Sequence, residues 1–250
     1  MWKKRVEQIA SDNLHGASFL LQQAVELFEK IDSKQVAKEA AFALQNAKPF
    51  MAPLYNFSKH ILQNVSNYKD EARTFFENER EEQKRVVEKA QELFFDGCCV
   101  LTHSYSSLVA ETLIKASRKF KIKVYCTESR PMREGVELAK KLLQNGIETR
   151  LIVDAAAGWT TKRCDFVLFG ADGIGTFGLV HKLGSYPIAL SANHNRIPVY
   201  SIATTARLWP EDFILPQEIS KPCQEIEATL PCENLYFDMT PKEFFTTVLP

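Results

Sequence analysis

The chain has 250 residues, of which 45% are apolar, and this is enough to bury one large core or two modest ones. Its 31 Lys and Arg residues balance 31 Asp and Glu residues, so no net field draws it to nucleic acid or to an anionic membrane. The sequence contains neither a signal-peptide core nor a run of about 18 apolar residues. We therefore expect a cytoplasmic protein without a direct nucleic-acid or membrane partner.

The first 95 residues have the pattern of a helical domain. Apolar positions recur at spacings of three and four, as at Phe19, Leu20, Ala24 and Leu27, and Gly and Pro are scarce. The charged stretch 69–94 has mixed signs at helical spacing and predicts one long helix with its apolar residues turned inward. We place the end of this domain at residue 95.

From Gly97 the pattern changes to short β-branched runs that alternate with helical segments. Five buried runs separated by helices predict a parallel sheet with right-handed crossovers within residues 96–250. A helix over 134–145 is expected to end at Asn145-Gly146, and the proline-rich tail from about residue 207 is expected to be irregular. The expected strands are 98–102, 123–128, 149–154, 165–170 and 198–204.

Neither the cysteines nor the histidines have the spacing of a metal site. The six cysteines contain no Cys-x-x-Cys pair and most lie in apolar runs, so we expect free, buried thiols. The five histidines have no i, i+4 pair and no neighbouring cysteines, so we expect no metal and no cofactor. The cysteines are Cys98, Cys99, Cys126, Cys164, Cys223 and Cys232.

The glycines at 173, 175 and 178 match the spacing G-x-G-x-x-G of dinucleotide-binding sites. Such a site needs the glycines to open a helix after a strand, with an acidic residue about 20 positions later. Here the next helix is predicted to begin near Gly184, and Asn193-His194-Asn195 stands at the later position. The spacing therefore does not indicate nicotinamide binding.

Polar residues follow the predicted strands where parallel sheets bind ligands, beyond the carboxyl ends. Singly, such residues commonly cap the next helix, but capping does not explain Arg130 or the small neighbours of Asp172. We therefore expect one ligand-binding rim. A triad of Ser104, His103 and Asp172 is not expected, because adjacent strand residues face opposite sides and no G-x-S-x-G elbow is present. The rim residues are Ser104, Arg130, Asp154, Asp172 and Thr204-Thr205.

Seven short segments carry a resemblance to a known family. They are HGAS (15–18), MAPLYN (51–56), THSYSS (102–107), TESRP (127–131), GADGI (170–174), HKLGSYPIAL (181–190) and YFDMTP (236–241). In this order they resemble the alpha, beta and delta subunits of translation initiation factor 2B, methylthioribose-1-phosphate isomerase and ribose-1,5-bisphosphate isomerase, and most of all the archaeal and eukaryotic alpha-like members. The resemblance implies an α/β fold, with a helical N-terminal domain followed by a Rossmann-like parallel-sheet domain that forms a homodimer.

The resemblance also implies two candidate catalytic residues. The isomerases shift hydrogen between C2 and C1 of an aldose phosphate, using a Cys in Thr-His-Cys and the Asp of Gly-Ala-Asp. Asp172 matches that Asp, whereas Ser104 stands at the position of the Cys. A serine hydroxyl gives up its proton far less readily than a thiol, whose pKa is about 8.5, so Ser104 would need a partner base.

Further positions match ligand-binding motifs of the family. The family's Arg-Gly-Ala appears here as His15-Gly16-Ala17, and its Asn-Lys appears as His181-Lys182. The loss of that Arg and Asn predicts a ligand held differently from ribose-1,5-bisphosphate, with Lys182 and Arg130 as its phosphate partners. The ligand contacts implied are Gly16, Ala17, Arg130, His181 and Lys182.

Two functions follow from these residues. Ser104 and the changed Arg and Asn positions favour a regulatory, factor 2B alpha-like protein that binds a phosphorylated sugar or a nucleoside monophosphate and contacts a translation-factor partner. Asp172, Arg130 and Lys182 favour an aldose-ketose isomerase of the ribose-1,5-bisphosphate or methylthioribose-1-phosphate type, with Asp172 as its acid/base residue.

Overall fold

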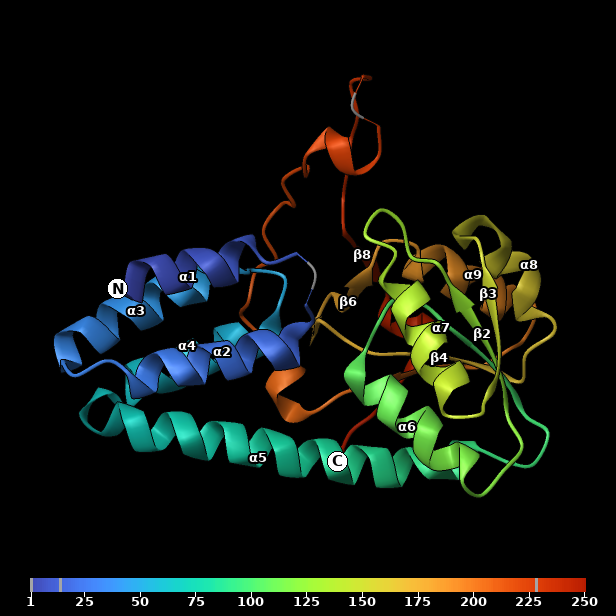
Figure 1. Ribbon diagram of the computed structural model, residues 1–250, viewed down its shortest axis with the longest axis horizontal. Helices are drawn as coiled ribbons and strands as arrows, with labels where there is room; N and C mark the ends of the chain where they lie inside the picture. The colour runs from blue at the N-terminus through green and yellow to red at the C-terminus, as the bar shows by residue number, and fades with distance from the viewer. Residues whose placement is uncertain (1, 14, 228) are drawn as a thin grey trace.

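The N-terminal part of the protein is a bundle of helices in the computed structural model, which describes residues 2–13, 15–227 and 229–250 (Figure 1). Phe28 and Phe57 meet edge to face in its core, with ring centroids 5.4 Å apart. The charged stretch forms a long helix that ends at Lys89, five residues before the end of the predicted stretch, and a 3₁₀ helix follows it over Ala90–Leu93. The helices are α1 (Trp2–Ser11), α2 (Ala17–Glu29), α3 (Lys34–Ala47), α4 (Ala52–Gln63) and α5 (Tyr68–Lys89).

The C-terminal part contains a six-stranded parallel sheet in the order β3-β2-β1-β4-β7-β9. Helices cover both faces, because successive residues of a strand point to opposite sides. In β1, Val100 packs with α6 and α7, whereas Leu101 packs with α8 and α9. The strands are β1 (Cys99–Thr102), β2 (Lys123–Thr127), β3 (Glu148–Ile152), β4 (Phe166–Phe169), β7 (Val199–Ile202) and β9 (Thr246–Val248). The helices are α6 (Ser107–Ser117), α7 (Glu134–Gln144), α8 (Ala157–Thr161) and α9 (Ser185–His194).

The predicted α/β class is confirmed, and the five expected strands are β1, β2, β3, β4 and β7. Helix α7 stops before Asn145-Gly146, where Gly146 adopts a positive φ of 76°. The predicted boundary at residue 95 lies between a 3₁₀ helix and β1. The 3₁₀ helices are η1 (Val65–Asn67), η2 (Ala90–Leu93), η3 (Asp154–Ala156), η4 (Thr205–Arg207), η5 (Cys223–Glu225) and η6 (Lys242–Phe244).

A second, antiparallel sheet was not predicted. It joins β5 (Gly173–Gly175), β6 (Gly178–Lys182) and β8 (Phe237–Thr240), so the three spaced glycines form a hairpin rather than the start of a helix. Gly178 has a φ of 136°, and a Cβ there would lie 2.2 Å from the main-chain oxygen of Thr240. The hairpin carries the end of GADGI and the start of HKLGSYPIAL toward the helical part.

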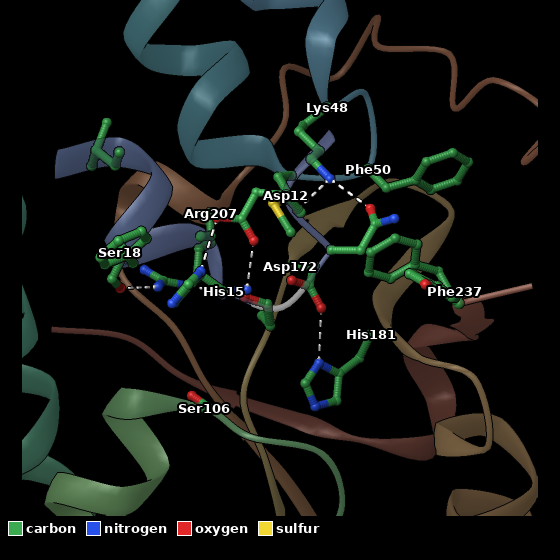
Figure 2. A pocket seen from close by; sticks show the side chains of 18 of the residues that line it. Asp12, His15, Ser18, Lys48, Phe50, Ser106, Asp172, His181, Arg207 and Phe237 are labelled. Carbon is green, nitrogen blue, oxygen red and sulfur yellow. Dashed lines mark hydrogen bonds and ion pairs between the residues drawn. The ribbon is translucent and has the colours of Figure 1, made fainter. Parts of the chain in front are cut away.

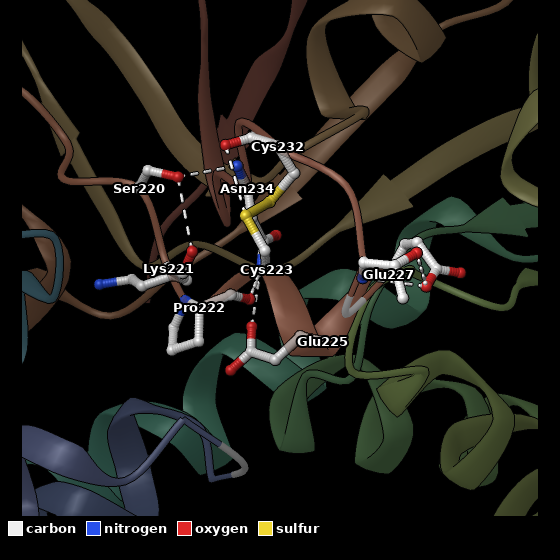
Figure 3. Close-up of a disulfide and its surroundings, with 9 residues drawn as sticks. Ser220, Lys221, Pro222, Cys223, Glu225, Glu227, Cys232 and Asn234 are labelled. Atoms are coloured by element: carbon white, nitrogen blue, oxygen red, sulfur yellow. Dashed lines mark hydrogen bonds between the residues drawn. A yellow bond between two sulfur atoms is a disulfide. The ribbon is translucent and has the colours of Figure 1, made fainter.

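The tail is only partly irregular. Strands β8 and β9 lie in it, and between η4 and β8 the chain protrudes from the molecule in a segment here called the tail loop (residues 216–227 and 229–236; Figure 1). Figure 3 shows its disulfide and the surrounding residues. In this loop Cys223 and Cys232 form a disulfide with their Cα atoms 5.6 Å apart. The prediction of six free thiols is therefore wrong for this pair. Both cysteines follow a proline in a polar segment, unlike the four cysteines that remain free.

The two parts of the molecule pack directly against each other. The side-chain amide of Asn56, on α4, donates to the main-chain oxygens of Ala206 and Leu208, both at 2.8 Å. The main-chain amide of Ala52 donates to the main-chain oxygen of Asp172 at 2.9 Å. In the described part of the chain, no helix has the length and apolarity needed to cross a membrane.

Candidate functional site

A cavity of about 1130 Å³ lies between the helical bundle and the carboxyl ends of the sheet strands (Figure 2). Its walls come from the start of α2, the loop between α3 and α4, α5, the loop after β1, α7, β6 and the tail loop. The two candidate catalytic residues and four of the five predicted ligand contacts line it. These residues are Gly16, Ala17, Ser104, Asp172, His181 and Lys182.

Arg130, the remaining predicted contact, does not line this cavity. It is exposed, and its main-chain amide, like that of Ser129, donates to the Asp154 carboxylate at 2.7 Å. Asp154 therefore organises the loop after β2 rather than the cavity wall. The role of Arg130 as a phosphate partner stays a prediction.

Asp172 and His181 form a polar pair on one wall. The His181 Nδ1 lies 3.1 Å from Asp172 Oδ2, and His181 Nε2 lies 3.3 Å from the main-chain oxygen of His103. The His181 side chain is buried, whereas that of Asp172 is 17% exposed toward the cavity. Two main-chain hydrogen bonds fix the backbone of Asp172. Its amide donates to the main-chain oxygen of Val180 at 3.0 Å, and its main-chain oxygen accepts from the amide of Ala52 at 2.9 Å. The pair thus presents a fixed carboxylate to a bound ligand.

His103 is buried beside this pair and does not serve Ser104. Its Nδ1 lies 2.7 Å from the hydroxyl of Thr127, and its Nε2 lies 2.9 Å from the main-chain oxygen of Leu183. Burial, followed by the nearby His181, lowers the pKa of His103 to about 4. A neutral ring that donates from Nε2 and accepts at Nδ1 satisfies both contacts, so His103 supports the loop instead of forming a triad.

Ser104 instead contacts Glu134, the first residue of α7. The Ser104 Oγ donates to Glu134 Oε1 at 2.9 Å, and Lys182 Nζ lies 3.0 Å from the same oxygen. The other Glu134 oxygen is buried and receives no hydrogen bond from the described residues. Ser104 adopts a positive φ of 68°, which turns its side chain at the end of β1 toward α7. Glu134 was not predicted from the sequence, although it lies only three residues after the end of the TESRP segment.

Lys48, in the loop between α3 and α4, is a second residue that sequence analysis missed. Its Nζ donates to the main-chain oxygen of Asp12 at 2.6 Å and to the side-chain oxygen of Asn13 at 3.0 Å. Burial, followed by the ammonium of Lys221, lowers the pKa of Lys48 to about 8, while the charge of Asp12 acts on it in the opposite direction. Neither oxygen that accepts from Lys48 carries a formal charge, and Lys48 and Lys221 both line the cavity. Its position shortly before the family segment MAPLYN could have pointed to it in the sequence.

Arg207 and Glu79 form a buried ion pair in the wall between the two parts. The Arg207 Nη1 lies 2.6 Å from Glu79 Oε1, and the two side chains are 6% and 2% exposed. Arg207 also donates to the main-chain oxygen of Ala171 and to the Ser18 hydroxyl, both at 3.0 Å. The guanidinium therefore fixes the helical bundle against the strand end that carries Asp172.

The described residues contain no group of three or more His, Cys, Asp or Glu side chains placed to hold a metal ion. The side chains that line the cavity include carboxylates, hydroxyls, imidazoles, guanidinium groups and ammonium groups. Such groups bind hydroxyls and anions and can move protons.

The Initiation factor 2 subunit family matches residues 12–249 of the sequence. The chain belongs to this family. The match spans both the helical bundle and the sheet part, and it confirms the family inferred from the seven segments.

Relatives in the family include translation factors and enzymes. The crystal structure of translation initiation factor eIF-2B from Pyrococcus horikoshii is 30% identical, with a TM-score of 0.90 over 99% of this chain and 94% of that chain. Translation initiation factor eIF2B subunit alpha of Caenorhabditis elegans is 30% identical over 92% of this chain and 78% of its own length. Ribose 1,5-bisphosphate isomerase of Methanocaldococcus jannaschii is 28% identical over 99% of this chain and 89% of its own length.

Proposed function

We propose that the chain is a cytoplasmic, eIF2B alpha-like regulatory protein that binds a phosphorylated sugar or a nucleoside monophosphate in this cavity. The observation that carries the proposal is the Lys48–Lys221 pair, whose two ammonium groups share a cavity with Ser104 and Asp172. Ammonium groups suit a phosphate, and the carboxylate and hydroxyl suit the hydroxyls of a sugar. The likeness to the eIF2B alpha subunit supports action through a translation-factor partner.

The position of Ser104 favours regulation over catalysis. Ser104 has Glu134 as its hydrogen-bond partner, but a carboxylate is a far weaker base than a serine alkoxide and removes the hydroxyl proton poorly. The same Glu134 oxygen is already engaged by Lys182 at 3.0 Å. Ser104 therefore acts as a hydrogen-bonding group for the ligand.

An aldose-ketose isomerase is the second candidate. Two hydrogen-bonded pairs of side chains on the cavity wall favour it. They are Asp172 with His181 and Glu134 with Ser104. A shift of hydrogen between neighbouring sugar carbons needs an acid and a base of this kind. The likeness to ribose 1,5-bisphosphate isomerase supports the same candidate.

The phosphate contact of Lys48 predicts a pH dependence of ligand binding. Lys48 is charged below its pKa of about 8 and neutral above it, so affinity for ribose 5-phosphate is expected to fall between pH 8 and pH 9.5. Loss of one proton limits the fall to roughly tenfold per pH unit. Lys48→Arg keeps its charge throughout this range and should bind equally well at both pH values. Titration calorimetry of both proteins measures this.

The matched control for that titration is Lys48→Met, which should bind weakly at every pH. Affinity of the unmodified protein that stays constant to pH 9.5 would contradict the phosphate contact, as would tight binding by Lys48→Met. The comparison separates Lys48 from other groups that titrate in the same range.

We also propose that the protein forms a homodimer through the sheet part. Strand β3 lies at the edge of the parallel sheet, and exposed apolar side chains gather on β3 and the segment after it. Leu151, Val153 and Trp159 are 46%, 57% and 55% exposed. Sedimentation equilibrium should give the mass of a dimer, and Trp159→Asp should shift it toward monomer. A monomer at micromolar concentration would contradict this interface.

A further inference from the structure

The cavity has two walls of opposite character. Lys48 and Lys221 bring positive charge to the wall formed by the α3–α4 loop and the tail loop. Asp172 and Glu134 bring carboxylates to the wall around Ser104. A ligand with one phosphate and a set of hydroxyls would match both walls, with the phosphate at the lysines.

Lys182, which the sequence suggested as a phosphate partner, forms an ion pair with Glu134 on the second wall. Its Nζ lies 3.0 Å from Glu134 Oε1, and its side chain is only 6% exposed. The ring of Tyr236 covers it, with the Nζ 4.8 Å from the ring centroid. A buried ammonium that is paired in this way offers little net charge to a second phosphate.

Glu134 also needs a donor rather than an acceptor. One of its oxygens takes both the Ser104 hydroxyl and Lys182, while the other is buried and receives no hydrogen bond from the residues that the structure describes. The Glu134 side chain is 19% exposed and lines the cavity, so a sugar hydroxyl can donate to its carboxylate from the cavity side. A phosphate dianion only accepts, so it cannot serve Glu134, and Lys182 has no net positive charge left to hold it because it is paired with Glu134.

We propose that Glu134 is a specificity-determining residue, which makes the cavity select a ligand with a single phosphate and a free hydroxyl at the Ser104 end, against a sugar bisphosphate. This inference rests on the proposed sugar-phosphate or nucleotide function and names the class of ligand for the same site. It separates this chain from a protein that acts on a 1,5-bisphosphate, because a second phosphate placed at the Ser104 end would lie beside Glu134, which contacts Ser104.

The test compares ribose 5-phosphate and ribose 1,5-bisphosphate by titration calorimetry at pH 7. The unmodified protein should bind the monophosphate more tightly by roughly tenfold or more. Glu134→Gln keeps an acceptor for Ser104 but removes the negative charge and releases Lys182. The preference should therefore fall by roughly tenfold or reverse.

The matched control is Glu148→Gln, which removes a carboxylate that also pairs with a lysine, Lys123, at 3.1 Å but lies outside the cavity. It should leave the preference unchanged. Equal affinities of the unmodified protein for the two ligands would overturn the inference and leave the proposed function standing, as would an unchanged preference in Glu134→Gln. If neither ligand nor a nucleoside monophosphate binds the unmodified protein, both the inference and the proposed function are wrong.

Discussion

Arg207→Met is expected to lower the free energy of unfolding by about 3 to 5 kcal/mol, which is the cost of leaving a buried charge without its partner. Glu79 would keep its carboxylate in a site where its side chain is 2% exposed. The Gln83 side-chain amide would still donate to Glu79 Oε1 at 3.0 Å, but it carries no charge to offset that of the carboxylate. The other Glu79 oxygen receives no hydrogen bond from the described residues. The loss should appear as a lower urea midpoint with an unchanged slope.

The matched control removes both charges. Glu79→Leu combined with Arg207→Met should recover most of the lost stability, because replacing a buried ion pair by apolar side chains is often nearly neutral. If Arg207→Met changes the free energy of unfolding by less than about 1 kcal/mol, which is the usual value for an exposed ion pair, the prediction is wrong. A double variant as unstable as Arg207→Met would indicate that the hydrogen bonds to Ser18 and Ala171 matter more than the ion pair.

Asp172→Asn is expected to weaken the binding of ribose 5-phosphate by roughly 10- to 100-fold, the value of one hydrogen bond to a charged group. The substitution keeps the shape of the side chain and both main-chain contacts of residue 172. It removes the charge that faces His181 and that, in the proposed complex, accepts from a sugar hydroxyl. If the protein interconverts an aldose phosphate and a ketose phosphate, the same change should abolish that turnover, since an amide neither takes up nor releases a proton.

Calorimetry measures the affinity and NMR measures ketose formation in the same samples. The matched control is Asp32→Asn, which changes a carboxylate that is 92% exposed on the surface. An Asp172→Asn protein that binds within twofold of the unmodified one would remove Asp172 from the ligand site. Turnover by the unmodified protein that Asp172→Asn abolishes would establish the isomerase as the function.

The parts of the fold that were predicted depend on local patterns. Within the run 165–170, residues 166–169 are all apolar and lie between Asp165 and Gly170, which is sufficient to indicate the buried strand β4. The ends of such strands placed Ser104 and Asp172 at the cavity, since parallel strands deliver their carboxyl ends to one edge. The seven segments then connected these residues to one family.

The parts that were missed depend on contacts between distant residues. Strands β5 and β6 are three and five residues long, and β6 pairs with β8, which lies more than fifty residues later. No local pattern shows such a pairing. Glu134 is the first residue of α7, and Lys48 follows α3 in the helical bundle. Neither residue ends a strand, so the rule that ligands bind beyond strand ends does not point to them. The Cys223–Cys232 disulfide likewise requires the tail loop to fold back on itself.

The central claim is that the cavity between the two parts binds a phosphorylated ligand through Lys48. Titration calorimetry of the unmodified protein at pH 7 with ribose 5-phosphate, and separately with ribose, tests it most directly. We predict one site for ribose 5-phosphate and binding of ribose that is weaker by roughly 100-fold, because ribose cannot use the two ammonium groups. Equal binding of the two sugars, or no binding of ribose 5-phosphate and of a nucleoside monophosphate, would contradict it.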